Sequence, residues 1–427
     1  MRGRVHARRT LKGLVADLRY NKRVFMNNVA LLMGFYPKAI YDKILADSIT
    51  MPQYAADALQ KSFIVGVSRK VHTTVINLPY VGSFPKRYRS LFVPGIIGNE
   101  LGANVRSLRY CNLTYLKNFS RIREAFCALK KWTKESPNNR TVVIYAIHLP
   151  FLIAVARLKK IVPDLKVIQI VPDLPEFMNS KPSRLHSLSY SKTSDYYYVV
   201  DGWILLSKYM TDKLNITDKP WRVIEGIYNP MDTPLDCVGE GSKSGFRIFY
   251  GGSLAKRYGI MNLVNAVANS SNMNIELVLC GYGDASNEIA MFSQKDSRIK
   301  LFGSVPRHEV LKLIRTSNLL VNPRTNEGEF TKYSFPSKTM EYLSSGVPTL
   351  LYRLPGIPEE YYKYCFSLER TGVDVLQAEL ERISRLPKEY MDEMGKKAMA
   401  FILDKKNPEA QCEKLISLIG QIEYEEI

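Results

Sequence analysis

Short apolar runs alternate with helical patterns along the chain, and this alternation constrains the fold more than any other feature. Continuous apolar strands separated by helices are typical of a parallel sheet that is covered on both faces. In the first half the predicted strands are Asn28–Met33, Val71–Asn77, Thr141–Ile147, Leu165–Val171, Trp203–Leu206 and Arg222–Ile224. In the second half they are Phe246–Tyr250, Ile275–Cys280, Ile299–Phe302, Leu319–Val321 and Val347–Tyr352, with helices over about Ile260–Ala268 and His308–Arg315.

A polar stretch from Tyr228 to Ser242 interrupts this alternation and is the predicted linker. With 427 residues, the chain exceeds the length at which one hydrophobic core stops growing. We therefore predict an α/β protein with two doubly wound domains. They are an N-terminal domain over residues 1–235, which begins with a basic leader over 1–23, and a C-terminal domain over 242–400. A final helix over 401–427 is expected to pack back on the N-terminal domain.

The net charge of +19 lies almost entirely in the first half of the chain. Residues 1–240 hold 36 Lys and Arg against 18 Asp and Glu, whereas residues 241–427 hold 24 against 23. Nucleic acid is not expected as a partner, because neither zinc-finger spacing nor an RNA-recognition signature occurs. An anionic membrane surface fits better, since each basic residue near such lipids contributes about 1 kcal/mol. A phosphate-rich acceptor and a merely soluble basic surface remain as alternatives.

Cysteine spacing and hydropathy indicate a cytoplasmic protein. The six cysteines, at 111, 127, 237, 280, 365 and 412, form no C-x-x-C pair and have no metal-ligand spacing, so we expect reduced thiols and no metal. No apolar run reaches the roughly 18 residues that a membrane-spanning helix needs. The basic leader lacks the apolar core of a signal peptide. Contact with the inner face of the cell membrane would therefore be peripheral.

The segment from Tyr333 to Pro348 predicts a loop, a short helix and a buried strand in succession. Pro336 is expected in the first helical turn and Ser334 as its cap, which leaves amides that suit a phosphate. Lys338 and Glu341 are three residues apart, so both lie on one helical face. A carboxylate beside a phosphate site suits the hydroxyls of a ribose, although a solvated Lys–Glu pair is the simpler alternative.

Two glycine turns follow strands in the second half. Gly251 and Gly252 allow close approach of a phosphate, with Lys256 and Arg257 nearby, although a glycine pair more often forms only a tight turn. The second turn, from Gly281 to Gly283, does not extend to G-x-G-x-x-G because residue 286 is Ser. This departure disfavours an NAD site, and a Walker A motif is absent as well.

Together these motifs resemble the family-four retaining glycosyltransferases, whose GT-B fold has two facing Rossmann-like domains with a cleft between them. The segments that carry the resemblance in the second half are Tyr250–Leu254, Tyr258–Ile260, Leu277–Gly283, Ile299–Val305, Asn318–Pro323, Pro336–Glu341 and Gly346–Pro348. In the first half, Gly82–Lys86, Val171–Pro175 and Asp201–Leu206 are similar to a bacterial polysaccharide and capsule branch.

The resemblance implies sugar transfer from a nucleotide diphosphate sugar, without any other cofactor, to a lipid-linked glycan acceptor in cell-surface polysaccharide synthesis. Glu341 would bind the donor ribose. The remaining donor-binding residues would be Gly251, Gly252, Ser253, Gly281, Tyr282, Tyr333, Ser334, Phe335, Pro336, Ser337 and Lys338.

The chain departs from the family pattern at two places. The family's phosphate-binding arginine and lysine align near Ser253 and Tyr258, so Lys256 and Arg257 are expected to act instead. The glutamate expected eight positions before Glu341 is Tyr333. Glu327 and Glu329 are the predicted replacements.

Two groups of residues in the first half complete the predicted site. His148 follows a strand, where a histidine is more often structural, but the resemblance implies contact with the donor sugar and a catalytic role. Gly34 resembles the acceptor-side turn. Cations and aromatic rings crowd the segment Tyr80, Lys86, Arg87, Tyr88 and Arg89, which we expect to meet a lipid-linked diphosphate; an exposed loop is the alternative.

Two other functions fit parts of the sequence. A nucleotide-sugar 2-epimerase shares the architecture and the donor site but uses no acceptor. A non-catalytic membrane or nucleic-acid binding protein would explain the basic half and leave the donor motifs unused.

Overall fold

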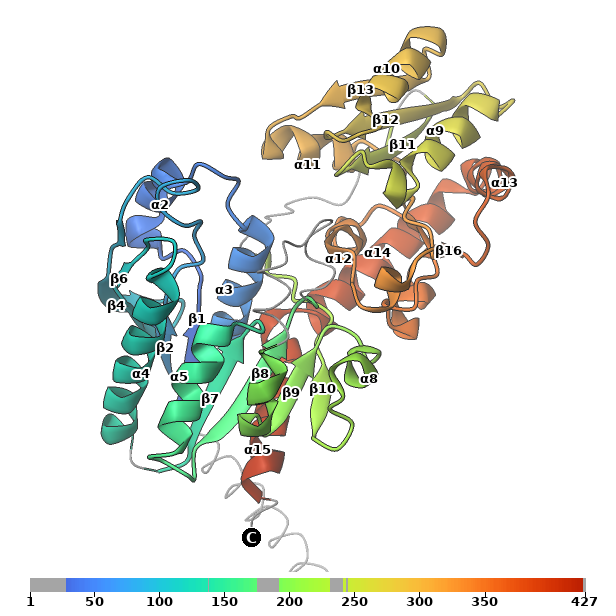
Figure 1. The fold of residues 1–427 in the computed structure, drawn as a ribbon. Helices are drawn as coiled ribbons and strands as arrows, with labels where there is room; N and C mark the ends of the chain where they lie inside the picture. Colours follow the sequence, from blue (N-terminus) through green and yellow to red (C-terminus); the bar gives the residue numbers. More distant parts are fainter. Residues whose placement is uncertain (1–27, 137, 175–191, 231–240, 243–244, 425–427) are drawn as a thin grey trace, which may run out of the picture. The chain divides into compact units, whose positions relative to one another are not determined.

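The computed structural model describes residues 28–136, 138–174, 192–230, 241–242 and 245–424 (Figure 1). The predicted leader 1–23 and most of the predicted linker lie outside these ranges. The chain splits into two compact units, Met1–Ile227 with Pro408–Ile427, and Tyr228–Asn407. The chain passes from the first unit to the second after residue 227, before the predicted end of the N-terminal domain at 235. It returns to the first unit at residue 408, after the predicted boundary at 401. Tyr228 belongs to the second unit because its ring is buried in that core and its amide donates to the Lys406 carbonyl over 2.8 Å.

The first unit contains an eight-stranded sheet in the order β10-β9-β8-β7-β1-β2-β5-β4. All neighbouring strands are parallel except β4, which pairs antiparallel with β5 at one edge. The bounds are β1 Asn28–Met33, β2 His72–Asn77, β4 Ile96–Glu100, β5 Ala103–Ser107, β7 Arg140–Tyr145, β8 Lys166–Val171, β9 Gly202–Leu205 and β10 Trp221–Val223; β3 Phe92–Val93 and β6 Tyr110–Cys111 form a separate pair. The six predicted strands lie within two residues of these bounds, and β3 to β6 were not predicted.

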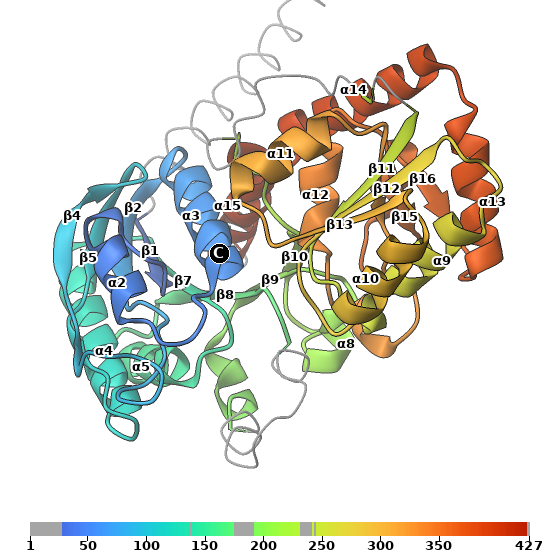
Figure 2. The ribbon, with the colours of Figure 1, turned by 90° about the horizontal axis from the view of Figure 1, so that it is seen from above.

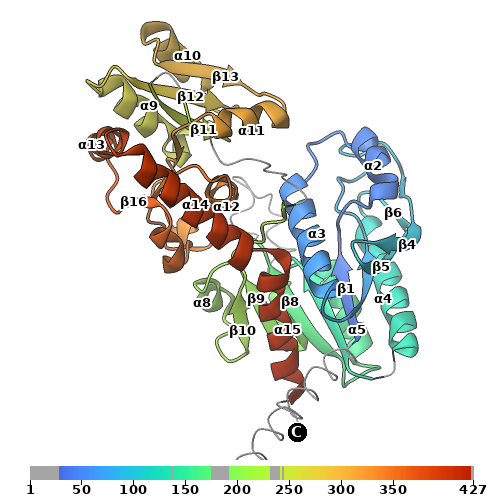
Figure 3. The ribbon, with the colours of Figure 1, turned by 180° about the vertical axis from the view of Figure 1, so that it is seen from behind.

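Helices cover both faces of this sheet because alternate strand residues point to opposite sides. Val29, Leu31 and Met33 share one core with α3 and α15, whereas the equally buried Ala30 and Leu32 point to the face covered by α4 and α5 (Figures 1 and 3). The helical bounds are η1 Lys38–Ile40, α2 Tyr41–Asp47, α3 Tyr54–Ser68, α4 Lys117–Glu135, α5 Leu149–Lys159, η2 Ser194–Val199, α8 Met210–Leu214 and α15 Pro408–Tyr424. The C-terminal helix α15 therefore packs in the first unit.

The second unit contains a parallel six-stranded sheet in the order β13-β12-β11-β14-β15-β16. Its strands are β11 Phe246–Gly251, β12 Ile275–Cys280, β13 Ile299–Gly303, β14 Leu319–Asn322, β15 Thr349–Tyr352 and β16 Phe366–Leu368. The first five match the predicted runs within two residues. The edge strand β16 was not predicted.

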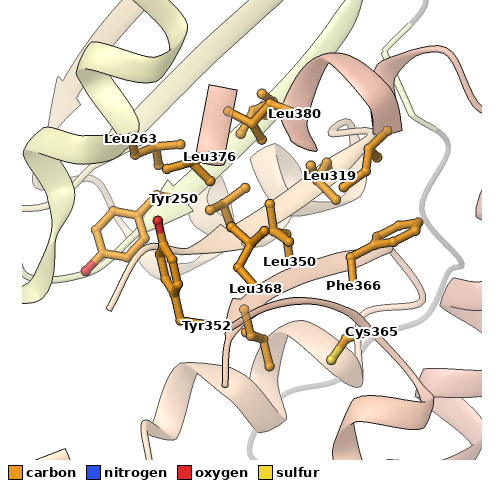
Figure 4. Close-up of a cluster of buried hydrophobic side chains, with 14 of the residues drawn as sticks. Tyr250, Leu263, Leu319, Leu350, Tyr352, Cys365, Phe366, Leu368, Leu376 and Leu380 are labelled. Carbon is orange, nitrogen blue, oxygen red and sulfur yellow. The ribbon is translucent and has the colours of Figure 1, made fainter. Parts of the chain in front are cut away.

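The helices of the second unit lie on both sides of its sheet (Figure 2). They are η4 Lys256–Tyr258, α9 Ile260–Asn269, α10 Ser286–Lys295, α11 Arg307–Arg315, η5 Glu329–Lys332, α12 Ser337–Leu343, η6 Glu359–Lys363, α13 Val373–Ser384 and α14 Lys388–Lys405. On one side, Leu263 of α9 and Leu376 of α13 pack over strand residues such as Leu319 (Figure 4). On the other side, Ile314 of α11 and Tyr342 of α12 enclose a second, smaller core. This double covering is the Rossmann-like arrangement predicted from the sequence.

Candidate functional site

Two predicted glycine turns meet at the carboxyl ends of β11 and β12. The Gly252 amide donates to the Cys280 carbonyl over 2.9 Å, and the Leu254 amide donates to the Tyr282 carbonyl over 3.0 Å. A Cβ atom on Gly281, which has a φ of +135°, would lie 1.7 Å from the Gly252 carbonyl oxygen. Only glycine fits there, because a side chain would collide with backbone. The structure therefore brings the predicted donor residues Gly251, Gly252 and Gly281 together, with Ser253 and Tyr282 exposed beside them.

A buried tyrosine fixes α12 against this turn. The Gly251 amide donates to the Tyr342 hydroxyl over 2.8 Å, and that hydroxyl lies 3.3 Å from the Gly251 carbonyl, to which it can donate. Burial raises the pKa of Tyr342 well above its usual value, so the hydroxyl stays protonated. No sequence pattern distinguishes Tyr342, because its position before Leu343 is typical of a core residue.

Glu341 lies between two cations on the surface of α12. Lys338 donates to one carboxylate oxygen over 2.6 Å, and Arg307 of α11 contacts the other. The side chain is only 14% exposed. Burial would raise the pKa of Glu341, but Lys338 and Arg307 outweigh it and hold the pKa below its usual value. Glu341 is therefore an ionised acceptor, and a carboxylate has further lone pairs for ligand hydroxyls.

The predicted cap of α12 is wrong. The helix begins at Ser337 with Pro336 as its N-cap residue, and no side chain caps it. The Ser334 hydroxyl instead donates to the Phe330 carbonyl and accepts from Arg324, both over 2.8 Å. The Ser334 hydroxyl thus bonds to the preceding turn η5 instead of capping α12, and the local cap pattern did not predict this bond. Phe335 packs in the core, with its ring centroid 5.3 Å from that of Tyr361.

Of the two predicted phosphate-binding cations, only one lies free of an acidic partner among the described residues. Lys256 is paired with Glu288 of α10, and its backbone amide donates to Asp284. Arg257 lies over the ring of Tyr258, 4.7 Å from its centroid. Arg324 lies over the same ring at 5.3 Å. Two guanidinium groups therefore lie over the ring of Tyr258, in the segment that follows the first glycine turn.

The loop before α12 brings one of the two replacement glutamates to Tyr333. The Tyr333 hydroxyl donates to Glu329 over 3.1 Å. Glu327 instead accepts a hydrogen bond from the Thr371 hydroxyl over 3.0 Å. Of the two predicted replacements, Glu329 is thus the one whose carboxylate contacts Tyr333.

The first unit contains a pocket of about 540 Å³ that holds part of the predicted acceptor site. Tyr80, Arg87 and His148 line it, together with Lys117 and Arg121 of α4. Lys86 is exposed and does not line the pocket, and Gly34 lies beneath it. A Cβ on Gly34 would lie 2.5 Å from the Tyr80 ring, so this glycine supports the pocket wall through Tyr80.

His148 is the N-cap residue of α5, with its side chain inside the pocket wall. Its Nε2 lies 3.0 Å from Nη1 of Arg121, and its ring centroid lies 5.3 Å from that of Tyr80. Burial, Arg121 and Lys117 lower the pKa of His148 well below its usual value, so the ring is neutral. Because Arg121 can only donate, Nε2 accepts and Nδ1 carries the hydrogen. Nδ1 is buried and has no partner among the described residues.

Comparisons with known proteins match a family model in the second unit and solved structures over both units. Residues 245–383 match the family model described as glycosyl transferases group 1. A sucrose-phosphate synthase from Thermosynechococcus elongatus is similar over 93% of this chain and 99% of its own, with 15% identity and a TM-score of 0.57. A trehalose-6-phosphate synthase, studied for glycosyl transfer with retention, is similar over 92% of this chain and 99% of its own, with 12% identity and a TM-score of 0.59. A lipopolysaccharide outer core galactosyltransferase is similar over 92% of this chain and 99% of its own, with 12% identity and a TM-score of 0.56.

The chain is a glycosyltransferase. Its fold is GT-B, with a Rossmann-like sheet in each unit. The reaction class is transfer of a glycosyl group from a nucleotide sugar. No curated protein sequence matches the chain. Among the described residues of this glycosyltransferase, no helix is both long and apolar enough to cross a membrane.

Arg324 and the α4 cations of the glycosyltransferase were missed in the sequence. Arg324 follows Asn322 and Pro323 at the end of β14, so its place after a strand was the available signal. Lys117 and Arg121 reach the pocket because α4 begins beside the segment from Pro79 to Ser83. The residues in contact are about forty positions apart in the chain, so no local sequence pattern predicts the contact.

Proposed function

We propose that this glycosyltransferase moves a sugar, with retention at the anomeric carbon, from a nucleotide diphosphate sugar to a lipid-linked glycan in cell-surface polysaccharide synthesis. The observation that carries the donor part is Glu341, an ionised and largely buried carboxylate on the helix that Tyr342 ties to the glycine turn. In this proposal Glu341 accepts hydrogen bonds from the ribose hydroxyls.

The leaving diphosphate needs positive charge near the glycine turns. Arg257 and Arg324 flank Tyr258 there, whereas Lys256 is held by Glu288. Preorganised donors stabilise charge that develops on a leaving group, and the acceptor hydroxyl then attacks from the same face. No protein nucleophile is required. We also propose that no metal takes part, so turnover in EDTA should equal turnover without it, and a loss that added Mg²⁺ restores would contradict this.

Retention is supported by a structural neighbour studied for that stereochemistry, and a cell-surface role by the lipopolysaccharide enzyme. A lipid-linked acceptor is supported by an exposed apolar face in the first unit. Met51, Tyr115 and Phe119 are 84%, 89% and 74% exposed. The segments that carry these side chains lie beside residues 84–92. The Ile49 amide donates a hydrogen bond to the Arg87 carbonyl, and the Asn112 amide donates one to the Leu91 carbonyl. We propose that this face meets the inner surface of the cell membrane, with Lys86 and its basic neighbours near anionic lipid.

Donor binding is tested by calorimetry with UDP, GDP and their sugars. Glu341→Gln should weaken binding of the preferred nucleotide about 10- to 100-fold, because a charged hydrogen bond contributes about 1.5–3 kcal/mol. Glu393→Gln is the matched control, since Glu393 also pairs with a lysine one turn away but lies on the exposed face of α14. Equal nucleotide affinity in wild type and Glu341→Gln would remove the ribose role.

The leaving-group cation is tested by turnover with an excess of donor. Arg257→Ala and Arg324→Ala should each lower kcat about 10- to 100-fold, and Lys256→Ala should change it little. If the two arginine variants retain full turnover, the assignment of the cations fails. NMR of the products separates transfer from epimerisation, because an epimerase would alter the donor sugar with no acceptor present.

A further inference from the structure

The first two turns of α4 place two cations in the wall of the pocket in the first unit. The Lys117 ammonium donates to the Val81 carbonyl over 2.5 Å and lies 3.5 Å from the Ser83 hydroxyl. Arg121, one turn further along, is only 3% exposed. It donates to the Pro79 carbonyl over 2.5 Å and to the Tyr110 hydroxyl over 3.0 Å. Arg121 also contacts the neutral His148 ring at Nε2. The hydrogen-bond partners of both cations are therefore uncharged.

Neither cation has an acidic partner among the residues that the structure describes. A third cation, Arg87, lines the same pocket. The one carboxylate in the described lining is Asp173, and burial raises its pKa to about 6. The surrounding sequence is equally one-sided, since residues 58–123 contain eleven Lys and Arg but a single acid, Glu100.

Two helix starts add to this positive potential. The first turn of α4 has no acidic residue and no side-chain cap, and the same is true of α5, which begins beside His148. Asn118 of α4 and Leu149 of α5 both line the pocket. The N-terminus of a helix carries about half a positive charge, so both helix dipoles favour an anion at this place.

Buried cations that lack a counter-charge destabilise a fold unless a ligand supplies the charge. Burial, Arg121 and Arg87 together lower the pKa of Lys117 to about 7, which reflects the missing counter-charge. Donor groups also remain unused: Nε of Arg121 and Nδ1 of His148 are buried with no partner among the described residues. The pocket thus offers cations and unpaired donors that suit an anion.

We infer that Lys117, Arg121 and Arg87 bind a phosphate group of the acceptor, so that the acceptor of this enzyme is a phosphorylated molecule. The inference rests on the proposed function in one respect, namely that the occupant is the acceptor. The phosphate can belong to a sugar phosphate or to a lipid-linked diphosphate. Both present the same oxygens to the three cations, and the test separates them.

The test is calorimetry on the full chain at pH 6.5, below the pKa of about 7 of Lys117, so that most Lys117 side chains are charged. The probes are glucose 6-phosphate and geranyl diphosphate, each paired with its neutral counterpart, glucose or geraniol. Wild type should bind at least one phosphorylated probe ten or more times more tightly than its neutral counterpart. The probe that binds identifies the source of the phosphate.

Two pocket variants and two controls locate the site. Lys117→Met and Arg87→Gln should each weaken binding of the phosphorylated probe at least tenfold. Lys134→Met, at the exposed far end of the same helix, should not. Arg324→Gln, in the second unit, should also leave the probe affinity unchanged. Circular dichroism on each variant verifies folding, and Arg87→Gln changes only an exposed side chain.

Three results would overturn the inference: no preference for the phosphorylated probes, wild-type affinity in Lys117→Met and Arg87→Gln, or loss of binding in Arg324→Gln alone. The last result would place the anion in the second unit. Failure of the proposed function looks different. In that case no nucleotide or nucleotide sugar binds, while phosphate binding persists in wild type and is lost in Lys117→Met.

Discussion

Replacing Tyr342 by Phe should loosen the glycine turn of the second unit without opening a cavity. The ring remains in the core, and only the hydroxyl is removed. That hydroxyl is the acceptor for the Gly251 amide at 2.8 Å. In Tyr342→Phe the amide is left buried without an acceptor, which costs about 1–3 kcal/mol. The second contact, 3.3 Å from the Gly251 carbonyl, is weaker and adds less.

Tyr352→Phe is the matched control. Tyr352 lies in β15 of the same unit and is 2% exposed, but its hydroxyl has no hydrogen-bond partner among the described residues. Removing it deletes a desolvated polar group and leaves nothing unpaired. We expect Tyr352→Phe to be as stable as wild type or slightly more stable. The comparison isolates the hydrogen bond from the general effect of removing a buried hydroxyl.

Hydrogen–deuterium exchange of the peptide that contains β11 measures the effect directly. Amide exchange there should be faster by roughly 5- to 150-fold in Tyr342→Phe, which corresponds to about 1–3 kcal/mol. The chain supplies an internal reference, because its three tryptophans, Trp132, Trp203 and Trp221, all lie in the first unit. Unfolding followed by tryptophan fluorescence should be unchanged. Equal exchange in wild type and Tyr342→Phe, or equal acceleration in Tyr352→Phe, would refute the reasoning.

Three further outcomes follow from the same structure. Sulfate, which stays a dianion, should bind the pocket of the first unit more weakly as the pH rises from 7 to 9: Lys117 has a pKa of about 7 and loses its charge in that window, whereas Asp173, with a pKa of about 6, is already ionised. Calorimetry that shows the same slope in Lys117→Met would contradict this. Gly281→Ala should destabilise the second unit far more than Gly303→Ala, as seen by circular dichroism, because the added Cβ meets backbone at 1.7 Å in the first case and nothing within 4 Å in the second, although both residues have positive φ; equal losses would contradict the steric argument. Leu418→Ala in α15 should lower the stability of the first unit by about 2–5 kcal/mol in urea unfolding followed by tryptophan fluorescence, and an unchanged midpoint would show that α15 is not part of that core.

The central strands were predictable because burial on both faces gives them mostly apolar runs, as in Asn28–Met33 and Ile275–Cys280. The edge strand β4 was not, since its residues are mostly exposed and it is defined by pairing with β5. The predicted donor residues Gly251 and Gly281 come together because each ends a parallel strand at the same edge of one sheet.

Ser334 was misread for a physical reason. Its sequence context satisfies a cap rule, but Arg324 and the turn before it offer its hydroxyl two hydrogen bonds. Arg324 itself, like Arg121 in the first unit, acquires its role from partners that lie far away in the chain or in another element. Such a role depends on tertiary contacts, and a pattern of neighbouring residues does not encode it.

The position of α15 has a consequence for biosynthesis. The second unit is one continuous segment that precedes α15 in the chain, so all of its residues leave the ribosome before α15 does. The first unit, although it is synthesised first, lacks Cys412, Leu415 and Ile419 of its core until the final helix emerges. We therefore expect the order of folding to reverse the order of synthesis. Nascent chains would expose the apolar face of α3 the longest, and this face is where a holding chaperone would act.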